Sequence, residues 1–574
     1  MVVGFFLLLL LFVAPGYLVL SRELGDEVRL SLSFAASVAL YSASAVVFKV
    51  LGLPVSFVFL LVLPACLLLF HRRATFDFSG GFRVLVLAAV GLCVLASLVP
   101  IFPFDTDGIF QILSGRSFLG EDWMSAGFID NYFQPVVFPQ PLTYRPPLNS
   151  LNMGLAFSLL GYSYDVAKSY SLVFVVALSL VVFSVAKRLF DEKTALLSSV
   201  LLILLSPYPI SLGLRVDVYN MAAYLILCFF LLWHLRGRWQ YLAVLTGLLY
   251  LAHPMSVVFL VSMLSYWLFT ERARVLRHVS WGGVFFVLLV FLVVSPWLIR
   301  NFLLFGNPLY NSSNAVLFSR DIEEYYRLSP PEVGDYMRYI LNPVNFVLIK
   351  GGAVWKTLLP VPYSVAYHRV QPFEVINPVA LYSTMAGVLG YPLFLLTIGL
   401  LFRRWREPIP FLFFAGFVLS MLVFGMRVSY TLSAIYPEVL LVGVLGLSVF
   451  KDDRRVLALI VLCAVLESCF VYIDLGRHEQ DMAAMEWIMN NTKSTDLLMS
   501  RQHVMINYLT DRRTLPTPSE DWTGISETIR RYHVNYFAVH SEDLRLRKLD
   551  LRVLNQTLEY QVATREYVIY KVPD

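Results

Sequence analysis

Residues 165–186, DVAKSYSLVFVVALSLVVFSVA, decide the fold, because a run of this length and composition is typical of one membrane-spanning helix. A bilayer core takes about 20 mainly apolar residues as a helix, and in lipid only helices or closed barrels satisfy every backbone hydrogen-bonding group. Long unbroken apolar runs recur along the chain. We therefore expect a polytopic α-helical membrane protein.

The composition of the whole chain agrees with this expectation. Of its 574 residues, 58% are hydrophobic and 15% are charged, and the mean hydropathy is +0.68. Soluble domains use roughly 45–50% apolar and 25% charged residues. The net charge of +5 is small, and Lys and Arg cluster between the apolar runs, so we expect no nucleic-acid partner. The five cysteines lie inside apolar runs without metal-ligand spacing.

The apolar runs divide the chain into about 14 expected spans, each near the length that a bilayer requires. The first lacks a basic leading region and a small-residue cleavage site, so we expect it to be retained rather than removed as a signal peptide. Two short spans meet at His253, which suggests half-length helices that end inside the protein. The expected spans are 3–20, 30–51, 54–71, 82–101, 165–186, 194–213, 218–235, 240–253, 255–270, 280–297, 381–402, 409–425, 430–450 and 455–473.

Short basic loops give the orientation. When alternate spans are counted, six basic stretches fall on one side, and the positive-inside rule makes that side the cytoplasm. The long hydrophilic segments and the three N-x-S/T sequons (Asn311, Asn490 and Asn555) then lie outside, in a cell membrane or an ER-like membrane. The basic stretches are HRR at 71–73, KR at 187–188, HLRGR at 234–238, RARVLR at 272–277, RRWR at 403–406 and KDDRR at 451–455.

This topology predicts large outer loops and a separate tail. The tail contains many charged residues interspersed with apolar ones. Helix-like stretches such as HEQDMAAMEWIMNN alternate in it with strand-like stretches such as VNYFAVH, which predicts a small extracytoplasmic α/β domain. The expected divisions are N-terminal spans 1–101, a first outer loop 102–164, a transmembrane core 165–297, a second outer loop 298–380, C-terminal spans 381–473 and the tail domain 474–574.

Two carboxylates, Asp105 and Asp107, begin the first outer loop. Simple solvation at a helix end is one explanation of them. The loop, however, is too long and too rich in aromatic residues to be a mere connector or a disordered segment. Ionisable residues also recur at the outer ends of later spans, where charges bordering hydrocarbon are costly and tend to mark a site. These are Arg215 with Asp217, His253, Arg300, and Arg427 with Tyr430.

A family resemblance follows from the order of these motifs. An acidic pair opens the first outer loop, and YRPPL at 144–148, LRVD at 214–217 and PWLIRNFLLFGNPLY at 296–310 follow. This order resembles the lipid-linked-sugar glycosyltransferases of the GT-C fold, in the branch that contains protein O-mannosyltransferases and lipid A aminoarabinose transferases. Oligosaccharyltransferases share the fold but carry a WWD motif that this chain lacks.

The resemblance implies transfer of a sugar from a polyprenyl or dolichyl phosphate to an acceptor hydroxyl of a glycan, lipid or protein, with inversion. An Asp would take the proton of the acceptor, and cations would stabilise the departing phosphate. Family spacing before an aromatic residue favours Asp107 as the base and leaves Asp105 as the alternative. No cofactor is required, although both carboxylates would be able to bind a divalent cation.

The resemblance also assigns roles to the other charged residues. Arg145 and His253, the latter where relatives often carry Lys, are expected at the donor phosphate with Arg215 and Arg300. An interfacial Arg145, a core His253 and an Arg215–Asp217 pair remain the structural alternatives. Tyr144, Asp217, Arg427 and Tyr430 are expected to line the substrate groove.

Two other functions stay open. A polytopic lipid or solute carrier would show midplane charges and paired repeats. The polar residues here gather at one face, and no repeat is visible in the sequence. A catalytically inactive GT-C-like subunit is the other alternative, because the Asp-Glu and Lys positions of the family are altered in this chain.

Overall fold

The computed structural model forms two compact units, and each is described by itself. Unit 1 comprises Met1–Ile101, Pro146–Leu309 and Val347–Gly476, and unit 2 comprises Phe102–Arg145, Tyr310–Phe346 and Arg477–Asp574. The structure describes residues 2–54, 77–100, 106–120, 125–129, 132, 138–141, 146–253, 256–275, 281–310, 326–329, 341–342, 344, 397, 399–424, 435–475, 481–547 and 549–573.

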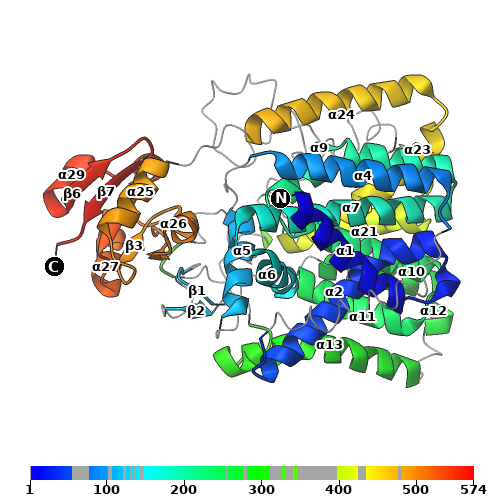
Figure 1. Ribbon diagram of the computed structural model, residues 1–574, viewed down its shortest axis with the longest axis horizontal. Coiled ribbons are helices and arrows are strands. Elements are labelled where there is room, and N and C mark those ends of the chain that lie inside the picture. The colour runs from blue at the N-terminus through cyan, green and yellow to red at the C-terminus, as the bar shows by residue number, and fades with distance from the viewer. Residues whose placement is uncertain are drawn as a thin grey trace. The chain divides into compact units, whose positions relative to one another are not determined.

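Unit 1 is helical throughout its described residues (Figure 1). The expected spans that fall there coincide with helices, whereas 54–71 and most of 381–402 lie outside the described residues. The helices are α1 Val2–Val19, η1 Arg22–Leu24, α2 Asp26–Val50, α4 Gly80–Leu98, α6 Leu148–Leu160, α7 Tyr164–Leu189, α8 Glu192–Ser199, η2 Val200–Leu204, α9 Pro207–Leu214, α10 Tyr219–His234, α11 Trp239–Ala252, α12 Ser256–Val275, α13 Trp281–Phe305, α21 Pro408–Phe424, α23 Tyr436–Phe450 and α24 Arg454–Leu475.

The length and apolar composition of its helices identify the chain as an integral membrane protein. Within the described residues, five helices are long and apolar enough to cross a bilayer, or six if the bent pair Glu192–Leu204 and Tyr208–Leu214 forms one span. Shorter apolar helices accompany them, so the structure supports a polytopic helical protein without fixing the count at about 14.

The opening stretch of sequence becomes α7, the most enclosed of the five described helices that are long and apolar enough to cross a bilayer. It is buried along its whole apolar length and packs against α1, α2, α4, α8, α9 and α10 (Figure 1). Ser163 caps its first turn by accepting from the Val166 amide at 3.2 Å, and Asp165 near the start and Lys187 near the end complement the helix dipole. The predicted single long apolar helix is confirmed.

Aromatic side chains connect the N-terminal helices to α7. The Phe12 ring of α1 lies 5.6 Å from Tyr170 and 5.7 Å from Tyr41, edge to face, and Tyr170 lies 5.3 Å from Phe174. Each such aromatic pair contributes about 0.5–1.5 kcal/mol to stability, in addition to the contribution from burying its apolar surface. The helices before the first outer loop therefore form one packed body with the core.

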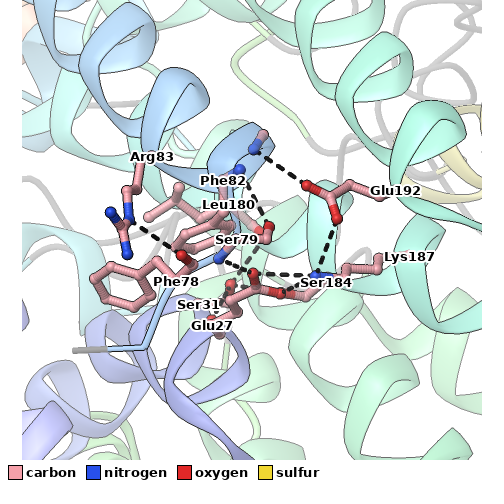
Figure 2. A network of polar contacts seen from close by, with 11 residues as sticks. Glu27, Ser31, Phe78, Ser79, Phe82, Arg83, Leu180, Ser184, Lys187 and Glu192 are labelled. Atoms are coloured by element: carbon pink, nitrogen blue, oxygen red, sulfur yellow. Dashed lines mark hydrogen bonds and ion pairs between the residues drawn. The ribbon is translucent and has the colours of Figure 1, made fainter. Parts of the chain in front are cut away.

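A polar network ties four helices together at one end of unit 1, and Figure 2 shows how its residues converge. Lys187 of α7 pairs with Glu27 of α2 at 2.8 Å and reaches Glu192 of α8 at 3.7 Å. The Ser79 amide donates to Glu27 Oε1 at 2.9 Å and the Gly81 amide to Glu192 Oε1 at 3.1 Å. Both carboxylates thus meet the amide-rich first turn of α4, where negative charge is favoured.

Unit 2 contains an α/β domain built from the tail. Its five-stranded sheet has the order β4-β3-β5-β7-β6, in which β3 runs parallel to β4 and β5, and β7 runs antiparallel to β5 and β6. The strands are β3 Leu497–Met499, β4 Arg513–Leu515, β5 Tyr536–His540, β6 Glu559–Ala563 and β7 Tyr567–Lys571, and the helices are α25 Met482–Asn491, α26 His503–Thr510, α27 Trp522–Tyr532, α28 Ser541–Leu546 and α29 Leu551–Thr557.

Alternation along the strands gives this sheet two buried faces. Leu498 packs with α25 and α26 on one face, whereas Met499 and Phe537 pack with α27 and α29 on the other. A period of two is expected of a pleated strand covered on both sides. The two tail stretches quoted from the sequence, HEQDMAAMEWIMNN and VNYFAVH, contain α25 and β5.

The first outer loop was expected over 102–164, and only its part Phe102–Arg145 belongs to unit 2, whereas α6 in its second part belongs to unit 1. The part in unit 2 contains α5 Thr106–Leu119, β1 Ser125–Ala126 and β2 Gln140–Pro141, and the two short strands pair antiparallel. Beyond β1, Phe128 pairs in parallel with Thr514 of β4. Since β4 is an edge of the five-stranded sheet, the loop extends that sheet.

Candidate active site

Asp107 occupies the first turn of α5 and is half-buried. The dipole of α5 is complemented at both ends, by Asp107 in the first turn and Arg116 in the last. Its apolar positions Ile109, Phe110 and Leu113 are buried. Asp107 is therefore held on a helix whose other face is packed. Asp105, the alternative base, lies outside the described residues.

The tail domain holds α5 through an apolar seam. Ile109, Phe110 and Leu113 of α5 pack with Phe128 of the loop and with Val504 and Met505 of α26. The rings of Phe110 and Phe128 lie 5.4 Å apart in an edge-to-face arrangement. The helix that carries Asp107 is thus positioned by residues nearly 400 positions further along the chain.

Backbone hydrogen bonds reinforce the seam. The Thr514 amide donates to the Gly127 carbonyl at 2.9 Å, and the Ile129 amide donates to the Thr514 carbonyl at 3.0 Å. A side chain at Gly127 would meet Asn507, because a Cβ there would lie 2.7 Å from Asn507 Nδ2. Only glycine leaves room for this close approach.

Two buried aromatic groups complete the attachment. The Tyr132 hydroxyl donates to the Pro516 carbonyl, its ring stacks on Tyr532 at 5.9 Å, and burial raises the pKa of Tyr132 well above its usual value. The His503 ring lies 6.0 Å from that of Phe128, and burial lowers the pKa of His503 to about 4, so its imidazole is neutral near pH 7.

Sequence reasoning missed these seam residues. It noted the aromatic content of the loop, but no local pattern relates Phe128 or Tyr132 to the tail. Lys168 is another missed residue, since it stood as a lone charge in an apolar run. It is fully buried, and its Nζ donates to the Val99 carbonyl at 2.8 Å and pairs with Asp165 at 3.0 Å. Lys168 therefore caps the end of α4 just before the first outer loop.

Arg215 and Asp217 flank a strained turn of unit 1. Arg215 ends α9 and is half-buried, and Asp217 is buried with its Oδ1 accepting from the Val218 amide at 2.7 Å. Val216 between them has a φ of 64°, which is costly for a β-branched residue. Such strained positions cluster at functional sites.

His253 is brought next to this turn. It is buried in an extended conformation at the end of α11, and its ring lies 5.2 Å from that of Tyr219 at the start of α10. Its carbonyl accepts from the Ser256 amide at 3.0 Å, which begins α12. The apolar parts of the two helices that flank His253 are short, as expected, at Trp239–Ala252 and Ser256–Thr270, and α12 continues beyond its apolar part to Val275.

Arg300 lies within α13 rather than in a loop. The helix was expected to end near residue 297 but continues to Phe305, and Pro296 is accommodated inside it. Arg300 is buried, lies over the Trp297 ring at 4.8 Å and donates from Nη1 to Asn301 Oδ1 at 3.0 Å. Its cationic head is therefore oriented by its own helix.

Several predicted residues have no described geometry. Tyr144, Arg145, Arg427 and Tyr430 lie outside the described residues, as does Asp105. Asp107 belongs to unit 2, whereas Arg215, Asp217, His253 and Arg300 belong to unit 1. Among the residues that the structure describes, no three His, Cys, Asp or Glu side chains gather as metal ligands would.

Comparisons with known proteins identify a family signature in unit 1. Residues 144–299 match the dolichyl-phosphate-mannose-protein mannosyltransferase family. This segment contains Arg215, His253 and the start of PWLIRN. No curated protein matches the chain in sequence.

Solved structures give the fold. The Archaeoglobus fulgidus oligosaccharyltransferase AglB, in complex with an inhibitory peptide and a dolichol-phosphate, has a TM-score of 0.51 at 12% identity over 83% of this chain and 72% of that one. A second structure of that organism's oligosaccharyltransferase, with zinc and sulfate, has a TM-score of 0.51 at 13% identity, and the match covers 86% of this chain and 74% of that one. ArnT from Cupriavidus metallidurans, bound to undecaprenyl phosphate, has a TM-score of 0.49 at 12% identity, and the match covers 86% of this chain and 98% of that one. In family signature and in fold, the chain resembles the GT-C glycosyltransferases that use lipid-linked sugars.

Proposed function

We propose that this protein transfers a sugar from a polyprenyl or dolichyl phosphate to an acceptor hydroxyl at the outer membrane face, with Asp107 as general base. The observation that carries the proposal is the placement of Asp107 on a helix that the tail domain holds by packing, pairing and hydrogen bonds. A proton acceptor must keep within hydrogen-bond reach of the reacting hydroxyl, and a loosely held loop would not achieve this.

The acceptor oxygen attacks the anomeric carbon while its proton passes to the Asp107 carboxylate, and the bond to the lipid phosphate breaks. One displacement of this kind inverts the anomeric centre and needs no second nucleophile. Negative charge grows on the departing phosphate, so cations near it lower the barrier. A divalent cation bound by Asp105 and Asp107 would supply the same stabilisation and is part of what the test below examines.

Unit 1 offers three nitrogen-bearing side chains for the phosphate, those of Arg215, His253 and Arg300. His253 lies against the Arg215–Asp217 turn through Tyr219. Gly247 of α11 approaches α13 so closely that a Cβ there would lie 2.7 Å from Val293. If α11 and α13 run in the same direction, as alternate spans do, the rise of about 1.5 Å per residue brings Arg300 to the level of His253. Arg145 is proposed as a further phosphate ligand from the sequence resemblance.

The test is a transfer assay with a panel of polyprenyl phosphate sugars. Asp107→Asn keeps the size of the side chain but cannot accept the proton, so transfer should fall by about 10²- to 10⁴-fold while donor binding persists. Asp105→Asn should lower transfer less than Asp107→Asn does. If Asp105 and Asp107 share a metal ion, both variants should be inactive and a chelator should have the same effect on the wild type.

Asp521→Asn is the matched control. Asp521 caps α27 by accepting from the Thr523 amide at 3.0 Å, and Asn caps equally well. Wild-type transfer by both Asp107→Asn and Asp105→Asn would overturn the assignment of the base. A wild-type chain that binds donor without transferring any sugar would favour the inactive subunit or the carrier.

A further inference from the structure

A cavity of about 340 Å³ lies within unit 2, at the seam between α5 and the tail domain. It is lined by the C-terminal half of α5, by the loop around β1 and by the end of α26. None of the catalytic roles proposed above uses it. Its size is at the lower end of ligand sites, which are typically about 300–1,000 Å³.

The cavity has a buried floor and a charged rim. Asn507, Ser125 and Leu113 are buried, whereas the side chains of Arg116 and Asp511 are 44% and 69% exposed. Arg116 Nη1 and Nη2 bind the two carboxylate oxygens of Asp511 at 3.1 and 3.3 Å. This fork-shaped pair neutralises its own charge, so the rim selects neither an anion nor a cation.

The remaining groups suit a ligand rich in hydroxyls. Ser117 Oγ accepts from the Ser125 amide at 2.6 Å and lies 3.3 Å from Ser125 Oγ, which fixes the two hydroxyls beside each other. Asn507 adds a side-chain amide, held by its donation to the Arg512 carbonyl at 2.6 Å. Groups that both donate and accept match the hydroxyls of a sugar, and Leu113 offers an apolar patch for a ring face.

The position of the cavity on α5 relates it to the proposed base. Ser117 follows Asp107 by ten residues of one helix, so about 15 Å separates them along the axis at 1.5 Å per residue. That separation exceeds one sugar ring. A ligand that fills the cavity and presents a hydroxyl to Asp107 must therefore be a chain of several units.

We propose that this cavity binds the non-reacting end of an oligosaccharide acceptor, whose other end presents its hydroxyl at Asp107. The proposal rests on the proposed function and extends it by naming a glycan as the acceptor class. It also predicts that acceptor length matters, because a monosaccharide cannot reach both places.

The first test compares acceptors of different length. Gly120 lines the cavity at its exposed rim, and a Cβ there would meet only the Ser117 carbonyl at 3.4 Å, so Gly120→Trp should fold and obstruct the cavity. We expect Gly120→Trp to raise the KM for linear oligomannosides of four or more units by about tenfold, with kcat and the KM for mannose unchanged. Leu119→Trp, on the same turn of α5 but outside the cavity, is the control.

The second test does not depend on transfer. Saturation-transfer NMR with mannotetraose on the full chain in detergent should show binding to wild type and to Leu119→Trp, and loss of binding in Gly120→Trp. This result would support the cavity even if no sugar donor is ever used. Absence of binding to wild type, a KM change that is equal for all acceptor lengths, or a KM change for hydroxyl-bearing peptides alone would overturn the proposal.

Discussion

Two glutamates of unit 1, the half-buried Glu27 and the buried Glu438, differ in how their charge is satisfied. Glu27 meets Lys187 at 2.8 Å and the Ser79 amide at 2.9 Å (Figure 2). Glu438, in the first turn of α23, is fully buried, and neither of its carboxylate oxygens has a hydrogen-bond partner among the described residues. A Cβ on Gly416 would lie only 3.0 Å from Glu438 Oε1, so the carboxyl group is tightly enclosed.

This contrast predicts opposite effects of the same substitution. Glu438→Met replaces an unsatisfied carboxyl group by an apolar one of similar length and should raise the free energy of unfolding by about 1–3 kcal/mol. Glu27→Met leaves Lys187 without its nearest carboxylate and should lower the free energy of unfolding. Thermal unfolding of the purified protein in detergent measures both. A lower unfolding temperature for Glu438→Met would mean that the carboxyl group binds a partner in the native protein.

At the scale of elements, the attachment of the first outer loop to β4 is the feature on which Asp107 depends. Gly127→Ala places a Cβ 2.7 Å from the Asn507 amide, which is itself fixed by a hydrogen bond. The loop should therefore move away from β4, and the Ile129 and Thr514 amides should exchange with deuterium about tenfold faster. Transfer should fall while donor binding persists, because the proposed phosphate ligands lie elsewhere.

Gly120→Ala is the control for this prediction. A Cβ there meets only an ordinary contact at 3.4 Å, so exchange at Ile129 and Thr514 should stay at the wild-type rate. Equal protection of both amides in Gly127→Ala and wild type would contradict the assigned role of the edge pairing.

The same element shows what the sequence was able to predict. Apolar length is a local signal, so α7 and the other spans in the described residues were predictable. The tail strands were predictable from alternation. The pairing of Phe128 with Thr514 was not, because it joins distant segments through backbone groups that any residue carries. The extent of α13 was missed because Pro296, normally a helix breaker, is tolerated inside it.

For the candidate site, residue type was easier to predict than environment. Asp107, His253 and Arg300 were selected as ionisable groups near the ends of apolar runs. That Arg300 lies inside a helix over Trp297, and that Val216 takes a left-handed conformation beside Arg215, depend on packing that a single sequence does not encode locally.

At the scale of the whole molecule, the expected topology places all the basic loops on one side of the membrane, and contacts join some of them within unit 1. Lys193 pairs with Asp452 at 2.6 Å, and Lys451 pairs with Asp191, so the loops at 187–193 and 451–455 meet at one face of unit 1. The Trp405 ring lies 6.0 Å from Phe269, which joins the RRWR loop to the end of α12. These contacts bring two pairs of basic segments together within unit 1, and their cytoplasmic location stays a prediction of the positive-inside rule.

The compartment that this face occupies is the last prediction. If the basic face is cytoplasmic, a cysteine introduced at Asp452, whose side chain is 75% exposed, should react with a membrane-impermeant maleimide only after the cells are permeabilised. A cysteine at Tyr560 on β6, 55% exposed, and one at Leu119 on α5 should react in intact cells. The cysteines are introduced into a variant that lacks the five native cysteines, so that the maleimide labels only the introduced one. The reverse pattern would place Asp107 and the tail domain in the cytoplasm, away from a sugar donor presented at the outer face, and would contradict the proposed reaction.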